Sequence, residues 1–212
     1  GVIPTIAPYI LPDLLSMLAE AYPDLQPRFV EEQTQHLITR LRNGNLDLAI
    51  MALPSEATGM VDSPLYTEKF SIVCPPDHPI AGREDVELAE LKDLDLLLLD
   101  DGHCLRDQVV DLCRHANINP AEATNSVTRA SSLTTIMQLV MGGLGCTLVP
   151  ESALATECHG KDVAVAHFAP DVTAEREVGL VFRSSAARAE EFREFGTLIT
   201  AAYNKAIERS RQ

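Results

Sequence analysis

One predicted helix of this sequence carries a cysteine at each end, Cys104 and Cys113. Between them, Leu105, Val109 and Leu112 recur at spacings of four and three, which places these side chains on one helix face. Nine helical residues rise about 13.5 Å, whereas a disulfide needs Cα atoms about 4.4–6.8 Å apart. The two thiols therefore either never pair or pair only when this helix unwinds.

Some neighbours of Cys104 favour a reactive thiolate, and others disfavour it. The run Leu96–Leu99 predicts a buried strand, and Cys104 follows it at the start of the helix. Backbone N–H groups and the helix dipole stabilise a thiolate at that position, and His103 and Arg106 are neighbours that act in the same direction. Three nearby aspartates disfavour a second anion. The direction of the pKa shift of Cys104 therefore stays open.

Two other interpretations of these cysteines need no reactivity. Free cysteines are commonly small buried hydrophobic residues, and Cys113 beside Leu112 fits that description. Metal binding is the second alternative, because two histidines, His103 and His115, lie next to or near the two cysteines. The segment lacks the short paired spacings typical of zinc ligands. We therefore predict no metal site and no cofactor.

The eight residues Asp101-Gly102-His103-Cys104-Leu105-Arg106-Asp107-Gln108, with a second cysteine five residues later, resemble the redox loop of the OxyR family. These proteins are the hydrogen peroxide sensors among the LysR-type transcription regulators. The segment Gly44–Ile50 and the glycine-rich turn Gly142–Pro150 are also similar to motifs of LysR-type effector domains. The resemblance implies that Cys104 is the thiol oxidised by peroxide and that Cys113 resolves it to a disulfide.

The resemblance further implies a set of residues that hold the peroxide. They are Thr5, Thr34, His103, Gln108 and Arg176. A hydroxide that leaves peroxide needs a proton or hydrogen-bond donors, which is the role expected of such groups. Without the resemblance, each threonine is interpreted as an ordinary helix cap, and Arg176 as a surface charge.

The order of elements predicts an α/β fold. Strands at 2–6, 25–31 and 46–50 alternate with helices that begin at Pro8 and at Thr34, and this alternation predicts a parallel sheet. A long helix is expected from Ala187 to about Arg209. We expect its buried face to consist of Phe192, Phe195, Leu198, Ile199 and Ala202.

We expect two Rossmann-like subdomains joined by two crossing strands, similar to a periplasmic binding protein. The first consists of residues 1–73 and 178–212, and the second, with the redox loop, of residues 74–177. Small ligands bind in the cleft of that fold, near helix N-termini.

The charge and cysteine content restrict the kinds of partner. A net charge of −14 repels phosphate, so we do not expect these 212 residues to bind DNA themselves. The first residues are apolar and contain no basic helix-turn-helix, so we expect a winged helix-turn-helix segment upstream. Five irregularly spaced cysteines and no apolar run of membrane-spanning length indicate a reducing, cytoplasmic setting.

These features predict the redox-sensing regulatory domain of a transcription factor, not an enzyme. By resemblance, oxidation remodels the helix and a homodimer or homotetramer, alters DNA binding, and is reversed by a thiol reductase system. The alternative is an effector domain that binds a small organic anion in its cleft. A thiol peroxidase is disfavoured because no C-x-x-C motif is present.

Overall fold

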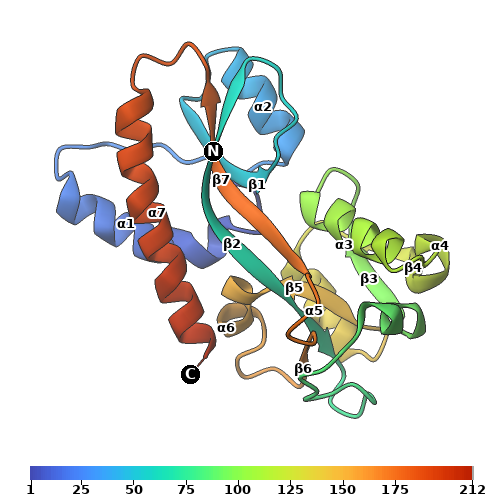
Figure 1. Cartoon of the computed structure of the whole chain (residues 1–212). Helices are drawn as coiled ribbons and strands as arrows, with labels where there is room; N and C mark the ends of the chain where they lie inside the picture. The colour runs from blue at the N-terminus through green and yellow to red at the C-terminus, as the bar shows by residue number, and fades with distance from the viewer. Residues whose placement is uncertain (212) are drawn as a thin grey trace. The chain divides into compact units, whose positions relative to one another are not determined.

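The computed structural model describes residues 1–211, except for the side chains of 124–129. The chain divides into two compact units, Gly1–Glu68 with Arg176–Gln212 and Lys69–Glu175. Two strands lead from one unit to the other, β2 (Met60–Cys74) and β7 (Glu175–Arg183), drawn in teal and orange in Figure 1. Each unit contains helices and strands, so the predicted α/β class is confirmed.

The first unit is built on a short antiparallel sheet with helices packed beside it. Strand β1 pairs with β7 along its whole length, from Leu48 opposite Phe182 to Leu53 opposite Glu177. The first and last helices of the chain pack on each other (Figure 1). The remaining elements of this unit are α1 (Ala7–Ala21), α2 (Thr34–Arg42), β1 (Leu48–Leu53) and α7 (Ala189–Ser210).

Two strands predicted in this unit are not formed. In the expected strand 2–6 only Val2 forms bridges, to Glu31 and Ile50, and a turn follows. The expected strand 25–31 is exposed from Leu25 to Phe29, and only Glu31 bridges to a neighbour. The parallel pairing predicted here is reduced to these bridges, because the full-length partner of β1 is the antiparallel β7. An alternating pattern without a partner strand leaves its backbone groups to water.

The second unit contains two groups of strands. Strand β2 lies between β5 and β6 and pairs antiparallel with both, so that Ser71 is opposite Val149 on one side and His167 on the other. Strands β3 and β4 form a parallel pair. The elements of this unit are η1 (Leu88–Asp93), β3 (Leu96–Leu99), α3 (Cys104–His115), α4 (Pro120–Ala123), β4 (Thr124–Ala130), α5 (Leu133–Met141), β5 (Thr147–Pro150), η2 (Glu151–Ala153), α6 (Leu154–Glu157) and β6 (Ala164–His167).

The buried strand predicted at Leu96–Leu99 is confirmed, because all four leucines of β3 are buried. Ser132 caps α5 by accepting a hydrogen bond from the Thr135 backbone N–H at 3.2 Å. In the glycine-rich turn, a Cβ on Gly145 would lie 2.1 Å from the carbonyl oxygen of Asp95, so only glycine fits. This turn therefore passes directly over the start of β3, which leads to α3.

The buried face predicted for α7 is partly wrong. Phe192, Ile199 and Ala202 are buried as expected, but Phe195 and Leu198 are only half-buried. The buried face continues instead toward the end of the helix. It consists of Phe192, Gly196, Ile199, Ala202, Tyr203, Ala206 and Ile207.

Candidate functional site

Cys104 occupies the first position of α3, with His103 as the N-cap residue. His103 is 5% exposed, and Cys104 is half-buried. The strand β3 ends at Leu99, so a buried strand and a short turn bring the chain to this helix start. Helix N-termini stabilise anions through their free N–H groups and dipole. The position therefore suits a thiolate.

Cys113 lies near the other end of the same unbroken helix and is fully buried. Neither cysteine is part of a disulfide, and burial raises the pKa of Cys113. Because the intervening helix holds the two Cα atoms about 13.5 Å apart, a Cys104–Cys113 disulfide requires α3 to unwind. The structure therefore describes the dithiol state of this pair.

The two ends of α3 are held unequally. At the C-terminal end, Asn117 has a φ of 57° and its N–H donates to the Arg114 carbonyl at 2.9 Å. The next N–H, of Ile118, donates to the Cys113 carbonyl at 2.9 Å, which completes a Schellman motif. At the N-terminal end the His103 side chain makes no capping hydrogen bond. The two ends of α3 therefore differ in their caps, and the Cys113 end is the one closed by a backbone motif.

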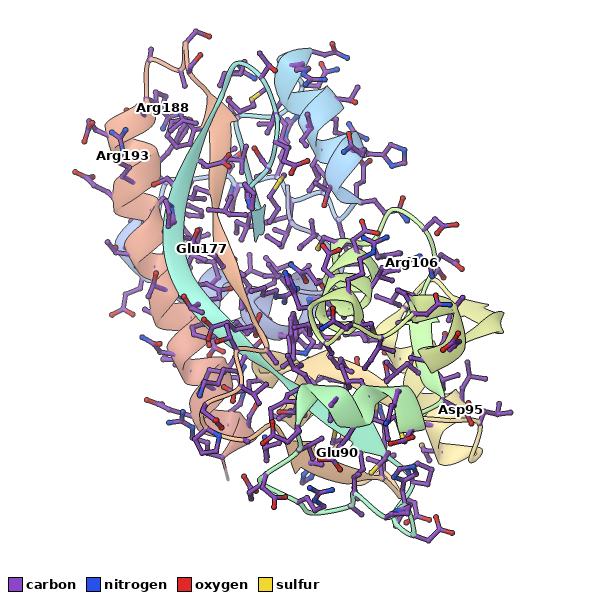
Figure 2. All side chains as sticks on the ribbon, turned by 45° about the vertical axis from the view of Figure 1, so that its right-hand side comes forward. Glu90, Asp95, Arg106, Glu177, Arg188 and Arg193 are labelled. Atoms are coloured by element: carbon purple, nitrogen blue, oxygen red, sulfur yellow. The ribbon has the colours of Figure 1, made fainter. Side chains whose placement is uncertain are left out.

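Charged groups near Cys104 lie mostly toward solvent. Arg106 projects from α3 (Figure 2) and forms an ion pair with Asp101 at 2.8 Å, in which the Asp101 side chain is 68% exposed. Burial raises the pKa of Asp107. On the same helix, Gln108 Oε1 is buried without a hydrogen-bond partner in the structure.

A second group of polar residues is buried in the first unit, around Arg176. Its Nε and Nη2 atoms lie 2.8 Å and 2.7 Å from Glu68 Oε2, and neither side chain has any exposed surface. Arg176 Nη1 donates to Thr5 Oγ1 at 2.8 Å, and Nη2 donates to the Thr5 carbonyl at 2.9 Å. Thr5 and Arg176, which were both predicted as site residues, are therefore in direct contact. Arg176 is buried and is not a surface charge.

Neither candidate threonine acts as a helix cap. The N-cap of α1 is Ile6, and the Thr5 hydroxyl accepts from Arg176 instead. Thr34 is the first residue of α2 after the N-cap Gln33, whose side chain makes no capping hydrogen bond. The Thr34 Oγ1 atom is buried with no hydrogen-bond partner in the structure. Both hydroxyls thus retain capacity to bind something else.

Sequence reasoning missed Glu68, although the strand pattern contains a signal for it. Glu68 precedes Phe70 by two residues, and Arg176 precedes Val178 by two, so each shares a face with a buried residue of its strand. A charged residue on the buried face of a strand indicates a buried partner of opposite charge. The partner itself, 108 positions away, is identified only by the three-dimensional structure.

The predicted site residues therefore fall into two groups, one in each unit. Thr5, Thr34 and Arg176 belong to the first unit, and the residues of α3 and its N-cap belong to the second. Across the part of the chain that the structure describes, no three His, Cys, Asp or Glu side chains are placed to hold a metal ion. In residues 1–211 no helix has the length and apolar character needed to cross a membrane.

Comparison with known proteins relates the whole chain to one family. Residues 1–204 match the LysR substrate binding domain family. A probable hydrogen peroxide-inducible genes activator of Mycobacterium avium is 48% identical over 199 residues, which cover 94% of this chain and 63% of the relative. The chain thus spans about 63% of the length of that relative.

Solved structures point to the same family. A peroxide-bound mutant of OxyR from Corynebacterium glutamicum superposes with a TM-score of 0.97 at 58% identity, over 100% of this chain and 66% of that one. The oxidised form of the same organism's OxyR gives a TM-score of 0.89 at 59% identity, over 100% and 65% of the two chains.

These likenesses confirm the periplasmic-binding-protein-like fold predicted from the sequence. The chain belongs to the family of LysR substrate binding domains and is an OxyR-like regulatory domain.

Proposed function

We propose that this domain senses hydrogen peroxide through Cys104 and reports it through the structure of α3. The observation that carries the proposal is the placement of one thiol at the accessible start of α3 and a second, buried thiol on the same helix. The relatives support it, because one is described as peroxide-bound and another as oxidised. Both proposed chemical steps take place at these two thiols.

In the first step the Cys104 thiolate attacks one oxygen of hydrogen peroxide. A sulfur–oxygen bond forms, the oxygen–oxygen bond breaks, and the leaving hydroxide takes a proton to become water. In the second step the Cys113 sulfur attacks the sulfenic acid, a disulfide forms, and a second water leaves. Two thiols and one peroxide thus give one disulfide and two waters.

Five further residues are proposed to bind the peroxide: Thr5, Thr34, His103, Gln108 and Arg176. Support comes from the polar atoms that the structure leaves available. The Thr34 hydroxyl oxygen and the Gln108 carbonyl oxygen are buried without hydrogen-bond partners. The Thr5 hydroxyl accepts a hydrogen bond from Arg176 with one of its lone pairs, and its own hydrogen remains able to donate. The two hydroxyls are able to donate to a leaving hydroxide, and the Gln108 oxygen is able to accept a hydrogen bond from peroxide.

The consequence of oxidation is proposed to be a change of assembly. Loss of α3 changes the surface of the second unit and with it the pairing of subunits in a homodimer or homotetramer. Altered pairing changes DNA binding through a winged helix-turn-helix segment outside these residues. A cytoplasmic thiol reductase system resets the disulfide, so the protein acts as a regulator rather than an enzyme.

Binding of a small organic anion is less well supported. The buried guanidinium of Arg176 is already neutralised by Glu68, with both side chains fully buried. An anion at this point would have to compete with a carboxylate that is covalently part of the chain. A neutral molecule meets no such competition.

Mass spectrometry of the treated domain tests the proposal. The reduced domain is exposed to about one equivalent of peroxide, matching the one-to-one stoichiometry of disulfide formation. Free thiols are then blocked, and the protein is digested without reductant. We expect a Cys104–Cys113 cross-link, absent from Cys104→Ser and Cys113→Ser. Oxidation of Cys104 no faster than that of Cys158 would refute the proposal.

A further inference from the structure

We propose that Glu68 is a positioning residue for the peroxide chemistry. It fixes and neutralises Arg176, so that the Thr5 hydroxyl is held as a hydrogen-bond donor toward the oxidant. This inference rests on the proposed function, in which Thr5 holds peroxide. Glu68 itself does not contact the oxidant and takes no direct part in that chemistry.

The first step of the argument is the geometry of the ion pair. Glu68 Oε2 accepts from Arg176 Nε at 2.8 Å and lies 2.7 Å from Nη2, so one carboxylate oxygen engages one edge of the guanidinium. The planar guanidinium is rigid, so fixing this edge also fixes the direction of Nη1. Nη1 donates to the Thr5 hydroxyl at 2.8 Å. Glu68 thereby determines where Arg176 meets Thr5.

The second step concerns the hydrogen of the Thr5 hydroxyl. A hydroxyl has one hydrogen to donate and two lone pairs to accept. Arg176 occupies a lone pair of Thr5 Oγ1, and its Nη2 also holds the Thr5 carbonyl at 2.9 Å. The hydroxyl hydrogen therefore remains available, and the adjacent cation makes it a stronger donor.

The third step concerns charge. Arg176 and Glu68 are both 0% exposed in their side chains, so an uncompensated guanidinium here would strongly attract an anion. With Glu68 in place the pair carries no net charge. Thr5 is 2% exposed and lies beside this neutral pair. A neutral donor suits an uncharged oxidant such as hydrogen peroxide.

In the proposed oxidation step, the sulfur–oxygen bond forms as the oxygen–oxygen bond breaks. The Thr5 hydroxyl donates a hydrogen bond to the departing oxygen, which takes a proton to become water. Removing the Glu68 carboxylate frees Arg176 to move and leaves Thr5 without a fixed partner. The effect is then specific to leaving-group stabilisation and does not involve the nucleophilicity of the thiolate.

The test compares two reagents on the Cys104 thiol of the whole chain. Hydrogen peroxide needs its leaving hydroxide stabilised, whereas iodoacetamide reports thiolate reactivity with a different leaving group. Rates are measured for wild type, Glu68→Gln and the control Glu177→Gln, by mass spectrometry of the Cys104 peptide. Glu177 is exposed on β7, one residue after Arg176 (Figure 2), so the control makes the same chemical change nearby.

We expect Glu68→Gln to slow oxidation by peroxide at least about tenfold, in line with loss of a positioned donor. Alkylation by iodoacetamide is expected to stay at the wild-type rate, and Glu177→Gln to match wild type with both reagents. Should Glu68→Gln fail to fold, Glu68→Asp, which retains the charge but withdraws it by one methylene, is expected to give the same selective loss.

Two results would overturn the inference while leaving the proposed function intact. One is an unchanged peroxide rate in a folded Glu68 variant. The other is an equal loss with both reagents, which would mean that Glu68 acts only through the fold. A third result, a wild-type Cys104 no more reactive toward peroxide than Cys158, would overturn the proposed function itself.

Discussion

The cluster of Thr5, Glu68 and Arg176 and the N-terminal end of α3 are both proposed to take part in peroxide chemistry, but their surroundings differ. In the cluster every residue is at most 3% exposed and the guanidinium meets three acceptor atoms. At the start of α3 the N-cap side chain makes no capping hydrogen bond, and Arg106 pairs with an Asp101 side chain that is 68% exposed. The cluster is buried throughout, whereas the start of α3 borders solvent.

The buried cluster and the start of α3 suit the two different tasks of a sensor, which are reaction with the oxidant and a change of structure. Groups that stabilise a leaving oxygen work best when they do not reorganise, because preorganised donors cost nothing to align during the reaction. A reporting element must instead change structure at a small free-energy cost. The Schellman motif holds the Cys113 end of α3, so opening is expected to begin where the oxidised residue lies.

The largest expected effect comes from breaking the buried cluster. Arg176→Ala leaves the Glu68 carboxylate buried without a counter-charge, and we expect a loss of about 3–5 kcal/mol in the free energy of unfolding. Arg106→Ala breaks an ion pair whose acid is 68% exposed, and we expect a loss of about 1 kcal/mol or less. Urea unfolding of both variants measures the contrast. Equal losses would contradict the proposed difference between the two regions.

The second expected effect concerns the packing of α3. Leu112 is 8% exposed on the buried face of α3, so Leu112→Ala is expected to cost about 2–5 kcal/mol. It should speed disulfide formation after Cys104 is oxidised, while the peroxide rate stays unchanged. Stopped-flow measurement of the two steps tests this.

Leu41→Ala is the matched control, because Leu41 is fully buried in the first unit. It is expected to destabilise the protein to a similar extent without speeding the disulfide step. An equal acceleration in both variants would mean that global unfolding, rather than opening of α3, limits disulfide formation.

Alkaline pH provides a third test, which acts on the second unit. All five cysteines belong to that unit, and thiols ionise at alkaline pH. Burial raises the pKa of Cys146 from 9.0 to about 12, so the folded state favours the protonated thiol. This stabilisation is complete below pH 9 and is lost as pH rises from 9 toward 12, because the unfolded chain releases the proton first. We expect a loss of about 1 kcal/mol at pH 10.

Thermal unfolding of wild type and Cys146→Ala from pH 8 to pH 10 measures this linkage. The variant should lose less stability across that range than wild type. Parallel stability curves would show that ionisation of Cys146 is not coupled to folding.

The smallest expected effect concerns the cap at the Cys113 end. Asn117 has a φ of 57°, so Asn117→Ala is expected to destabilise the domain by about 1 kcal/mol, since non-glycine residues without a short polar side chain are strained there. Asn117→Gly is the matched control and should be nearly neutral. Denaturant midpoints measure both. A neutral Asn117→Ala would mean that the cap does not hold α3.

Local structure was predictable wherever neighbours in sequence decide it. The spacing of Leu105, Val109 and Leu112 predicted α3, because helix periodicity depends on residues within one or two turns. The distance argument against pairing of Cys104 and Cys113 needed only helix geometry. The likeness of the redox segment to its family was also readable from contiguous residues.

Contacts between distant segments were decided only by the tertiary structure. The segment 25–31 has an alternating pattern but no adjacent partner strand beyond a single bridge at Glu31, so it remains exposed. Glu68 reaches Arg176 across 108 positions, and Arg176 reaches Thr5 across 171. Sheet pairing and buried charge pairs depend on which surfaces the whole chain brings together, and no local pattern encodes that choice. The sequence by itself determined the helix that carries Cys104 and Cys113, and only the folded chain determined how the cluster of Thr5, Glu68 and Arg176 is held.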